Sequence, residues 1–333
     1  MVLDKTTNSL PLVRERVWRS ARRTVEANFH KLSFQAMSTD CRVHFQAADS
    51  ALASEFEDTV LDWVVFFEAK YSRFLPDSLI SRINYAAGEQ WVEIDAETEA
   101  LFNLCQELLF FTRGVFDPTA LPLMRLWNWK AANPAIPTPA QIKETLELVG
   151  WRKVARRPGA IFLPRAGMMI DLGGVGKEYA VDRVLTMGLE RGIKNILVDF
   201  GQDVRVHGES PHKAPWCIGL ENPQAIGKCW TSVLVNNHAV ATSGDYLRHF
   251  VHAGRRYGHI VDPRDGYPAN TGVLSVSVVS PHCTFAGIVS TAAVILGPKH
   301  GLELMTFCPG VEGAIITDTS RFQTKGFNNF ATG

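Results

Sequence analysis

The segment from residue 168 to residue 208 constrains this chain most, because it combines a strand, a turn, a helix and another strand in one unit. Its sequence is MMIDLGGVGKEYAVDRVLTMGLERGIKNILVDFGQDVRVHG, and its helix stops at Gly192. The C-terminal third then carries one apolar helix, at 285–296, among short strands at 230–235, 273–279 and 314–317. Strands that follow one another without a helix between each pair predict an α+β fold rather than a doubly wound parallel sheet.

Helical periodicity is clearest in the N-terminal half. Apolar residues recur at helical spacing over 51–71 and 97–112, and a third helix is expected over 139–149. Residues 32–46 are typical of an opening strand with a polar turn. The first 31 residues contain five arginines and predict a basic helical extension, 1–31, which is followed by one larger domain, 32–333.

Charge and cysteine usage exclude several classes of protein. The 34 lysines and arginines balance 34 acidic residues, and a general nucleic-acid partner would need a basic surface. No run of about 18 apolar residues occurs, so we expect no membrane span. The N-terminus has no apolar signal region, which favours a cytoplasmic location. The six cysteines form no C-x-x-C pair, which favours free thiols over a zinc site or disulfides.

The strongest local motif is the glycine turn DLGGVGK, from Asp171 to Lys177, at the strand-to-helix junction. Glycines let backbone N–H groups approach a ligand, and a helix N-terminus favours an anion. The motif is not a Walker loop, because Asp171 and Glu178 stand where glycine and Ser or Thr are required. It is not a dinucleotide-binding fingerprint either, because Tyr179 stands where that motif requires glycine. The residues alone leave two interpretations open: an anion site, or a tight turn with a surface lysine.

Two further segments carry candidate chemistry. His259 lies in YGHIVDPRDGYP, where it could serve as a general base or only hydrogen-bond its own turn. Asp117 lies in GVFDPTALPL, where it could accept a ribose hydroxyl or a ring N–H, or cap the next segment. Both alternatives stay open for each residue.

Taken in order, nine segments of this chain resemble the ApbE family of FAD:protein FMN transferases. The match runs from about Phe34 to Gly310 and rests on these segments: AMST, RFLPDSLISRIN, GVFDPTALPLMRLW, IDLGGVGKEYAVD, VDFGQDVRVHG, WCIGLENP, VATSGDYLRHF, HIVDPRDGYP and CTFAGIVSTAAVILGP. The resemblance implies a T-fold-like α+β architecture with the nucleotide cleft between two lobes. It also implies Mg²⁺-dependent transfer of FMN from FAD to a threonine or serine hydroxyl of a target protein, with release of AMP.

The resemblance assigns roles to individual residues of this chain. Met37 and Phe74 match neighbours of the ring systems, and Val261 matches a backbone contact. His259 would be the base on the acceptor hydroxyl, and Lys177 would act on the diphosphate. The positions that match nucleotide-lining residues are Val115, Phe116, Asp117, Asp171 and Lys177.

The metal site is where this chain departs from the family pattern. The resemblance implies a backbone carbonyl near Gly174 and the side chains of Ser290 and Thr291, but an aspartate of the family is replaced by Gly287. We consider the hypothesis that Asp265 supplies the lost charge, because Mg²⁺ prefers charged oxygen ligands.

Gly287 also motivates an alternative function, an FAD-binding protein with little or no transferase activity or a slow FAD pyrophosphatase. A flavin-dependent redox enzyme is a third possibility, although no nicotinamide fingerprint supports it.

Overall fold

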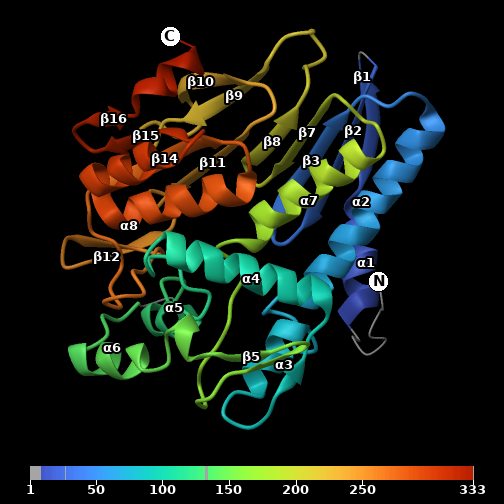
Figure 1. Cartoon of the computed structure of the whole chain (residues 1–333). Coiled ribbons are helices and arrows are strands. Elements are labelled where there is room, and N and C mark those ends of the chain that lie inside the picture. The colour runs from blue at the N-terminus through green and yellow to red at the C-terminus, as the bar shows by residue number, and fades with distance from the viewer. Residues whose placement is uncertain (1–8, 27, 132–133, 333) are drawn as a thin grey trace.

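The computed structural model describes residues 9–26, 28–131 and 134–332, and a nine-stranded antiparallel sheet forms its centre (Figure 1). Helices pack on this sheet and in a second lobe, which confirms the predicted α+β class. The strands lie in the order β1-β2-β3-β7-β8-β11-β14-β15-β16. Their bounds are Arg22–Glu26, Phe29–Ala36, Thr39–Phe45, Ile196–Phe200, Asp203–His207, Ala239–Gly244, Val273–Ser280, Glu312–Thr317 and Arg321–Gln323, in the same order.

Both faces of the sheet are covered. Helices α2 (Ser50–Tyr71), α7 (Gly176–Glu190) and α8 (Cys283–Phe307) pack on one face, as Figure 1 shows for α7 and α8. On the other face a small sheet packs, formed by β9 (Trp216–Glu221), β10 (Cys229–Val235) and β17 (Ala331–Thr332). Every residue of β14 is therefore buried, with Val278 facing α8 and Val279 facing the small sheet.

A second lobe contains short helices and small sheets (lower part of Figure 1). The predicted helices over 51–71, 97–112 and 139–149 are confirmed as α2, α4 and α6. The elements of this lobe are α3 (Leu79–Tyr85), β4 (Val92–Glu93), α4 (Ala96–Phe111), α5 (Leu121–Trp127), α6 (Pro139–Leu146), η1 (Trp151–Lys153), β5 (Ala155–Arg157) and β6 (Ala160–Phe162). Near it lies the hairpin of β12 (His249–His252) and β13 (Arg255–Gly258), and η2 (Lys325–Asn329) follows β16 in the chain.

The N-terminal segment differs from the predicted basic helical extension. Helix α1 covers Ser9–Ser20 only, and Arg22–Glu26 form the edge strand β1, so the sheet begins before the predicted boundary at residue 31. Val13 and Val17 are buried in the main core, so α1 is part of the domain. The sequence does not indicate this packing, because arginines lie between the buried positions and make the segment look polar. Residues 1–8 of the predicted extension lie outside the described part of the chain.

Helix α8 is longer than the predicted 285–296. Gly297 has φ 79° and interrupts the helix where the prediction ended, but helical turns continue to Phe307. Among the described residues it is the one helix long and apolar enough to cross a membrane by length and composition. Because 61% of its most apolar window is buried, against β11 and β14 among others, a place in the core explains that composition.

Asp182 fixes the packing of α7 against α8. Its carboxylate accepts hydrogen bonds from the backbone N–H groups of Cys283 and Thr284, both at 2.9 Å, and so caps the start of α8. Its Oδ1 also pairs with the Arg205 guanidinium of β8 at 2.9 Å. One side chain on α7 therefore ties together both helices and the sheet beneath them.

We expect Asp182→Ala to lower the free energy of unfolding by about 2–3 kcal/mol, because it removes a cap and leaves Arg205 unpaired. Urea denaturation followed by tryptophan fluorescence measures this change. Glu190→Ala is the matched control on the same helix, since its pair with Arg183 is exposed and contributes about 0–1 kcal/mol. Equal effects of the two substitutions would contradict the assigned role.

Candidate functional site

The glycine turn holds together three segments that are distant in sequence. Asp171 Oδ1 accepts a hydrogen bond from the N–H of Gly173 at 3.0 Å, and its Oδ2 pairs with Arg73 Nε at 3.0 Å. The backbone N–H of Asp171 donates to the Pro118 carbonyl at 2.8 Å. Gly174 lies beside the Phe116 ring, which a Cβ at this position would approach to 3.6 Å. The predicted residues Asp171, Gly174 and Phe116 are thus neighbours.

Lys177 is not the isolated surface lysine of the second interpretation. Its Nζ forms an ion pair with Asp203 of β8 and lies 3.4 Å from Oε1 of Glu178. Both carboxylates are largely buried, with exposed fractions of 7% for Asp203 and 8% for Glu178. The sequence analysis assigned a role to neither of them.

Phe74 stands exposed beside the turn. Its ring is 70% exposed, and the Arg73 guanidinium lies 4.1 Å from the ring centroid. Since Arg73 also pairs with Asp171, the aromatic face is held next to the glycine turn. An exposed ring at this place can stack on a planar ligand.

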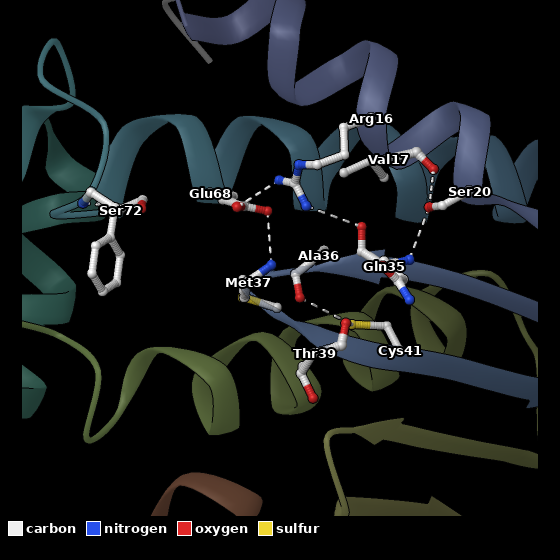
Figure 2. Close-up of polar contacts among 11 residues, drawn as sticks. Arg16, Val17, Ser20, Gln35, Ala36, Met37, Thr39, Cys41, Glu68 and Ser72 are labelled. Carbon is white, nitrogen blue, oxygen red and sulfur yellow. Dashed lines mark hydrogen bonds and ion pairs between the residues drawn. The ribbon is translucent and has the colours of Figure 1, made fainter. Parts of the chain in front are cut away.

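Met37 lies in a tight hairpin turn between β2 and β3, shown in Figure 2. Met37 and Ser38 have φ of 51° and 61°, as a two-residue type I′ turn requires. The Met37 N–H donates to Glu68 Oε2 at 2.8 Å, and Arg16 of α1 pairs with Glu68 Oε1 at 2.6 Å. Helix α1 thus supports the turn that presents Met37.

The GVFDP segment is packed into the protein at Val115 and Asp117, and its contact with a nucleotide stays a prediction. Val115 is 3% exposed and packs with Ala292 and Ile295 of α8, so only its backbone can face a nucleotide. The Asp117 carboxylate accepts backbone N–H bonds from Thr119 at 2.8 Å and Trp151 at 3.0 Å. Of its two open alternatives, the structure therefore favours capping.

His259 is half-buried and holds a defined tautomer. Its Nδ1 lies 3.2 Å from the Arg248 carbonyl, which can only accept, so Nδ1 carries the proton and Nε2 keeps its lone pair. Burial, together with the charges of Arg248 and Lys130, lowers the pKa of His259 to about 4. Neutral imidazole with a free Nε2 is the form that a general base requires.

The strand-like segment after His259 joins it to the rest of the site. Val261 pairs with Pro268 through a backbone bridge, which fits the backbone role that the resemblance implies. The neighbouring Ile260 packs on the cluster formed by Val115 and the α8 residues Ala292 and Ile295. This contact brings the histidine segment to the part of α8 that follows Thr291.

The predicted metal-binding side chains fall into two groups. Ser290 and Thr291 of α8 both hydrogen-bond to Ser243 of β11, with Oγ–Oγ distances of 2.7 and 2.9 Å. Asp265 is exposed and closes its own turn by accepting the N–H of Tyr267 at 2.9 Å. The adjacent Gly266 packs against the second lobe, at α5 and α6. Asp265 therefore has a local structural role in its own turn.

A carboxylate that the sequence analysis did not assign lies at the position of the missing family aspartate. A Cβ added to Gly287 would lie 2.7 Å from Cγ of Glu178. Glu178 Oε2 is buried and has no hydrogen-bond partner among the described residues. The available signal was an acidic residue directly after Lys177 in the first helical turn.

The fold and the site together define an α+β protein in which a glycine turn at a helix start lies near an exposed aromatic ring, a neutral histidine and a group of oxygen donors. The ApbE family model matches residues 37–315, so the chain belongs to the ApbE family.

Individual relatives agree with this assignment. The FAD:protein FMN transferase of Treponema pallidum is 32% identical over 268 residues, covering 75% of this chain and 73% of that protein. The ApbE protein of Thermotoga maritima superposes with a TM-score of 0.82 at 30% identity, over 92% of this chain and all of that one. The flavin transferase ApbE of Vibrio cholerae gives 0.77 at 25% identity, over 93% and 99%.

We expect Glu68→Ala to speed amide hydrogen exchange at Met37 by about 10- to 100-fold, because a hydrogen bond to a charged acceptor contributes about 1.5–3 kcal/mol. Mass spectrometry of the peptide that spans residues 34–40 measures the rate. Asp62→Ala is the control, since Asp62 contacts Trp18 and Arg14 of α1 but not the turn. Unchanged exchange in Glu68→Ala would show that the hairpin holds Met37 without α2.

Proposed function

We propose that this protein is an FAD:protein FMN transferase, which moves FMN from FAD to a threonine or serine hydroxyl of a target protein and releases AMP. The observation that carries the proposal is the glycine turn, which ends in Lys177 and begins at Asp171, with Arg73 joining Asp171 to the exposed Phe74 ring. Backbone N–H groups and a cation suit a diphosphate, and the ring suits a flavin or adenine. The relatives of Treponema pallidum and Vibrio cholerae, an FAD:protein FMN transferase and a flavin transferase, support the same reaction.

The proposed transfer is a displacement at phosphorus. The acceptor oxygen forms a bond to the phosphorus of the FMN half, and the bond from that phosphorus to the bridging oxygen breaks. AMP leaves with the bridging oxygen, and the hydroxyl proton passes to Nε2 of His259. Positioning and charge neutralisation dominate such reactions, so Lys177 and the turn contribute by holding the diphosphate.

We also propose that the reaction depends on Mg²⁺. The Gly174 carbonyl and the hydroxyls of Ser290 and Thr291 are oxygen donors, as a hard cation prefers, but all of them are neutral. Oε2 of Glu178, which is buried and has no hydrogen-bond partner among the described residues, would add a negative charge to the set. A Mg²⁺ ion held by these groups would neutralise charge on the diphosphate.

The decisive test supplies purified protein with FAD, Mg²⁺ and a peptide that carries a flavinylation motif with one threonine. We expect AMP release together with a gain of one phosphoester-linked FMN on the peptide, measured by chromatography and mass spectrometry. A peptide with Thr→Val should gain nothing, because it lacks the acceptor hydroxyl.

The same assay separates the other candidate functions. Intact FAD after long incubation favours the binding protein that Gly287 motivated. AMP and free FMN without peptide modification favour the pyrophosphatase. Reduction of the bound flavin by NADH or NADPH favours a redox enzyme.

The pKa of His259 gives a pH prediction. An imidazole with a pKa of about 4 stays neutral as the pH falls from 8 to 6, so kcat/KM for FAD should change less than about twofold over this range. Below that range the rate should fall as the base takes up its proton. His259→Asn should lower the rate by about 10²- to 10⁴-fold at pH 7.5. A wild-type midpoint near pH 6.5 would contradict the buried, neutral base.

We place the reaction in the cytoplasm, where the six free cysteines would stay reduced. Cys41, Cys105, Cys283 and Cys308 are buried, and burial raises the pKa of Cys41 and Cys105 to about 12. Cell fractionation followed by immunoblotting tests the location.

A further inference from the structure

We infer that Glu178 is the carboxylate ligand of the divalent-cation site, in place of the aspartate that the family carries at the position of Gly287. The inference rests on the proposed function, because that function supplies the diphosphate beside which the cation would sit. It replaces the Asp265 hypothesis with a residue that lies against the metal-site helix.

The register between α7 and α8 carries the first step. Asp182 of α7 binds the N–H groups of Cys283 and Thr284 at the start of α8. Glu178 lies four residues before Asp182 on α7, and Gly287 lies four residues after Cys283 on α8. Glu178 and Gly287 are in contact. The two helices therefore run antiparallel. From this contact, α7 leads back to the glycine turn at its start, and α8 continues to Ser290 and Thr291.

The burial of Glu178 supplies the second step. The residue is 8% exposed, and its Oε2 accepts no hydrogen bond from the described residues. An unsatisfied buried carboxylate oxygen costs free energy, so such a group normally has a partner in the working protein. A cation at this oxygen would satisfy it.

The local charge points to a cation. Lys177 brings one positive charge, whereas Asp203 and Glu178 bring two negative charges. Arg73 and Asp171 cancel one another at the other end of the turn. The carboxylates at the turn therefore exceed the cationic side chains by one charge, and a divalent cation that came with the diphosphate would offset this excess.

The composition of the site matches the cation. The described residues contain no group of three or more His, Cys, Asp or Glu that could hold a metal. Mg²⁺ commonly binds through one or two carboxylates together with substrate phosphates. Glu178 would supply one carboxylate, and Ser290, whose Oγ donates to the carbonyl of Gly287 at 2.9 Å, would supply a hydroxyl from the turn of α8 that Glu178 contacts.

Glycine at position 287 follows from the presence of Glu178. A Cβ at 287 would lie 2.7 Å from Cγ and 3.2 Å from Cδ of the glutamate, which is too close for both side chains to keep their places. Compared with the family pattern, the carboxylate therefore lies on α7 and not on α8. The Glu178 side chain occupies the space that a side chain at position 287 would need.

The test measures Mn²⁺ binding by electron paramagnetic resonance, with Mg²⁺ competition, in the full-length protein with and without ADP as the diphosphate probe. Thermal unfolding with and without Mg²⁺ provides a second readout. The variants are Glu178→Gln, the double substitution Glu178→Gly with Gly287→Asp, and Glu190→Gln as an exposed control on the same helix.

We expect Glu178→Gln to weaken Mn²⁺ binding on the order of 100-fold and to abolish the rise in Tm that Mg²⁺ causes in the wild type. Its Tm without metal should equal or exceed that of the wild type, because the substitution neutralises a buried carboxylate whose Oε2 has no hydrogen-bond partner among the described residues. The double substitution should bind Mn²⁺ more tightly than Glu178→Gln, because it returns a carboxylate to the same space. Glu190→Gln should bind like the wild type.

Wild-type affinity in Glu178→Gln would overturn the inference, as would a wild type that binds no Mn²⁺ with ADP present. A folded double variant no better than Glu178→Gln would also overturn it. The proposed function fails separately: a wild type that releases no AMP but needs Glu178 for Mn²⁺ disproves the transferase and leaves the ligand assignment standing. AMP release by the wild type, together with unchanged Mn²⁺ binding in Glu178→Gln, would support the transferase and disprove the ligand assignment.

Discussion

The antiparallel packing of α7 on α8 is the constraint on which the candidate site depends. Asp182 sets the register of the two helices by capping α8 and by pairing with Arg205 of the sheet. From that register it follows that the glycine turn before α7 and the second turn of α8 face one another. The start of α7 and the hydroxyl groups of Ser290 and Thr291 are therefore positioned by two packed core helices. Groups on packed helices are held more precisely than groups on loops.

The second lobe is attached to the same turn by polar contacts. Asp171 binds the backbone of Pro118 through its N–H and the side chain of Arg73 through its carboxylate. The segments that carry Phe74 and Phe116 are thereby fixed against the glycine turn.

The sequence predicts those parts of this structure whose signals are local. The helix at 51–71 follows from periodicity, the turn at the start of α7 from its glycines, and the family from ordered motifs. The role of Asp117 could not be decided, because a capping carboxylate and a ligand-binding carboxylate occur in the same kind of sequence. The edge strand at 22–26 was missed because its arginines resemble a solvated helix. The partners of Lys177 depend on β8, which only the folded sheet brings close.

Glu178 and Gly287 show why a departure from a family motif has to be judged together with its neighbours in space. The two positions are separated by more than one hundred residues, and only the α7–α8 packing makes them share one volume. Glutamate and aspartate together would collide there, and glycine at both positions would leave the cluster of hydroxyls without a charge. The carboxylate can therefore stand on either helix. A single substitution from one arrangement toward the other would either place two side chains in the same space or remove the carboxylate altogether. Because the charge is retained on α7, the glycine on α8 is weak evidence that the metal site has been lost.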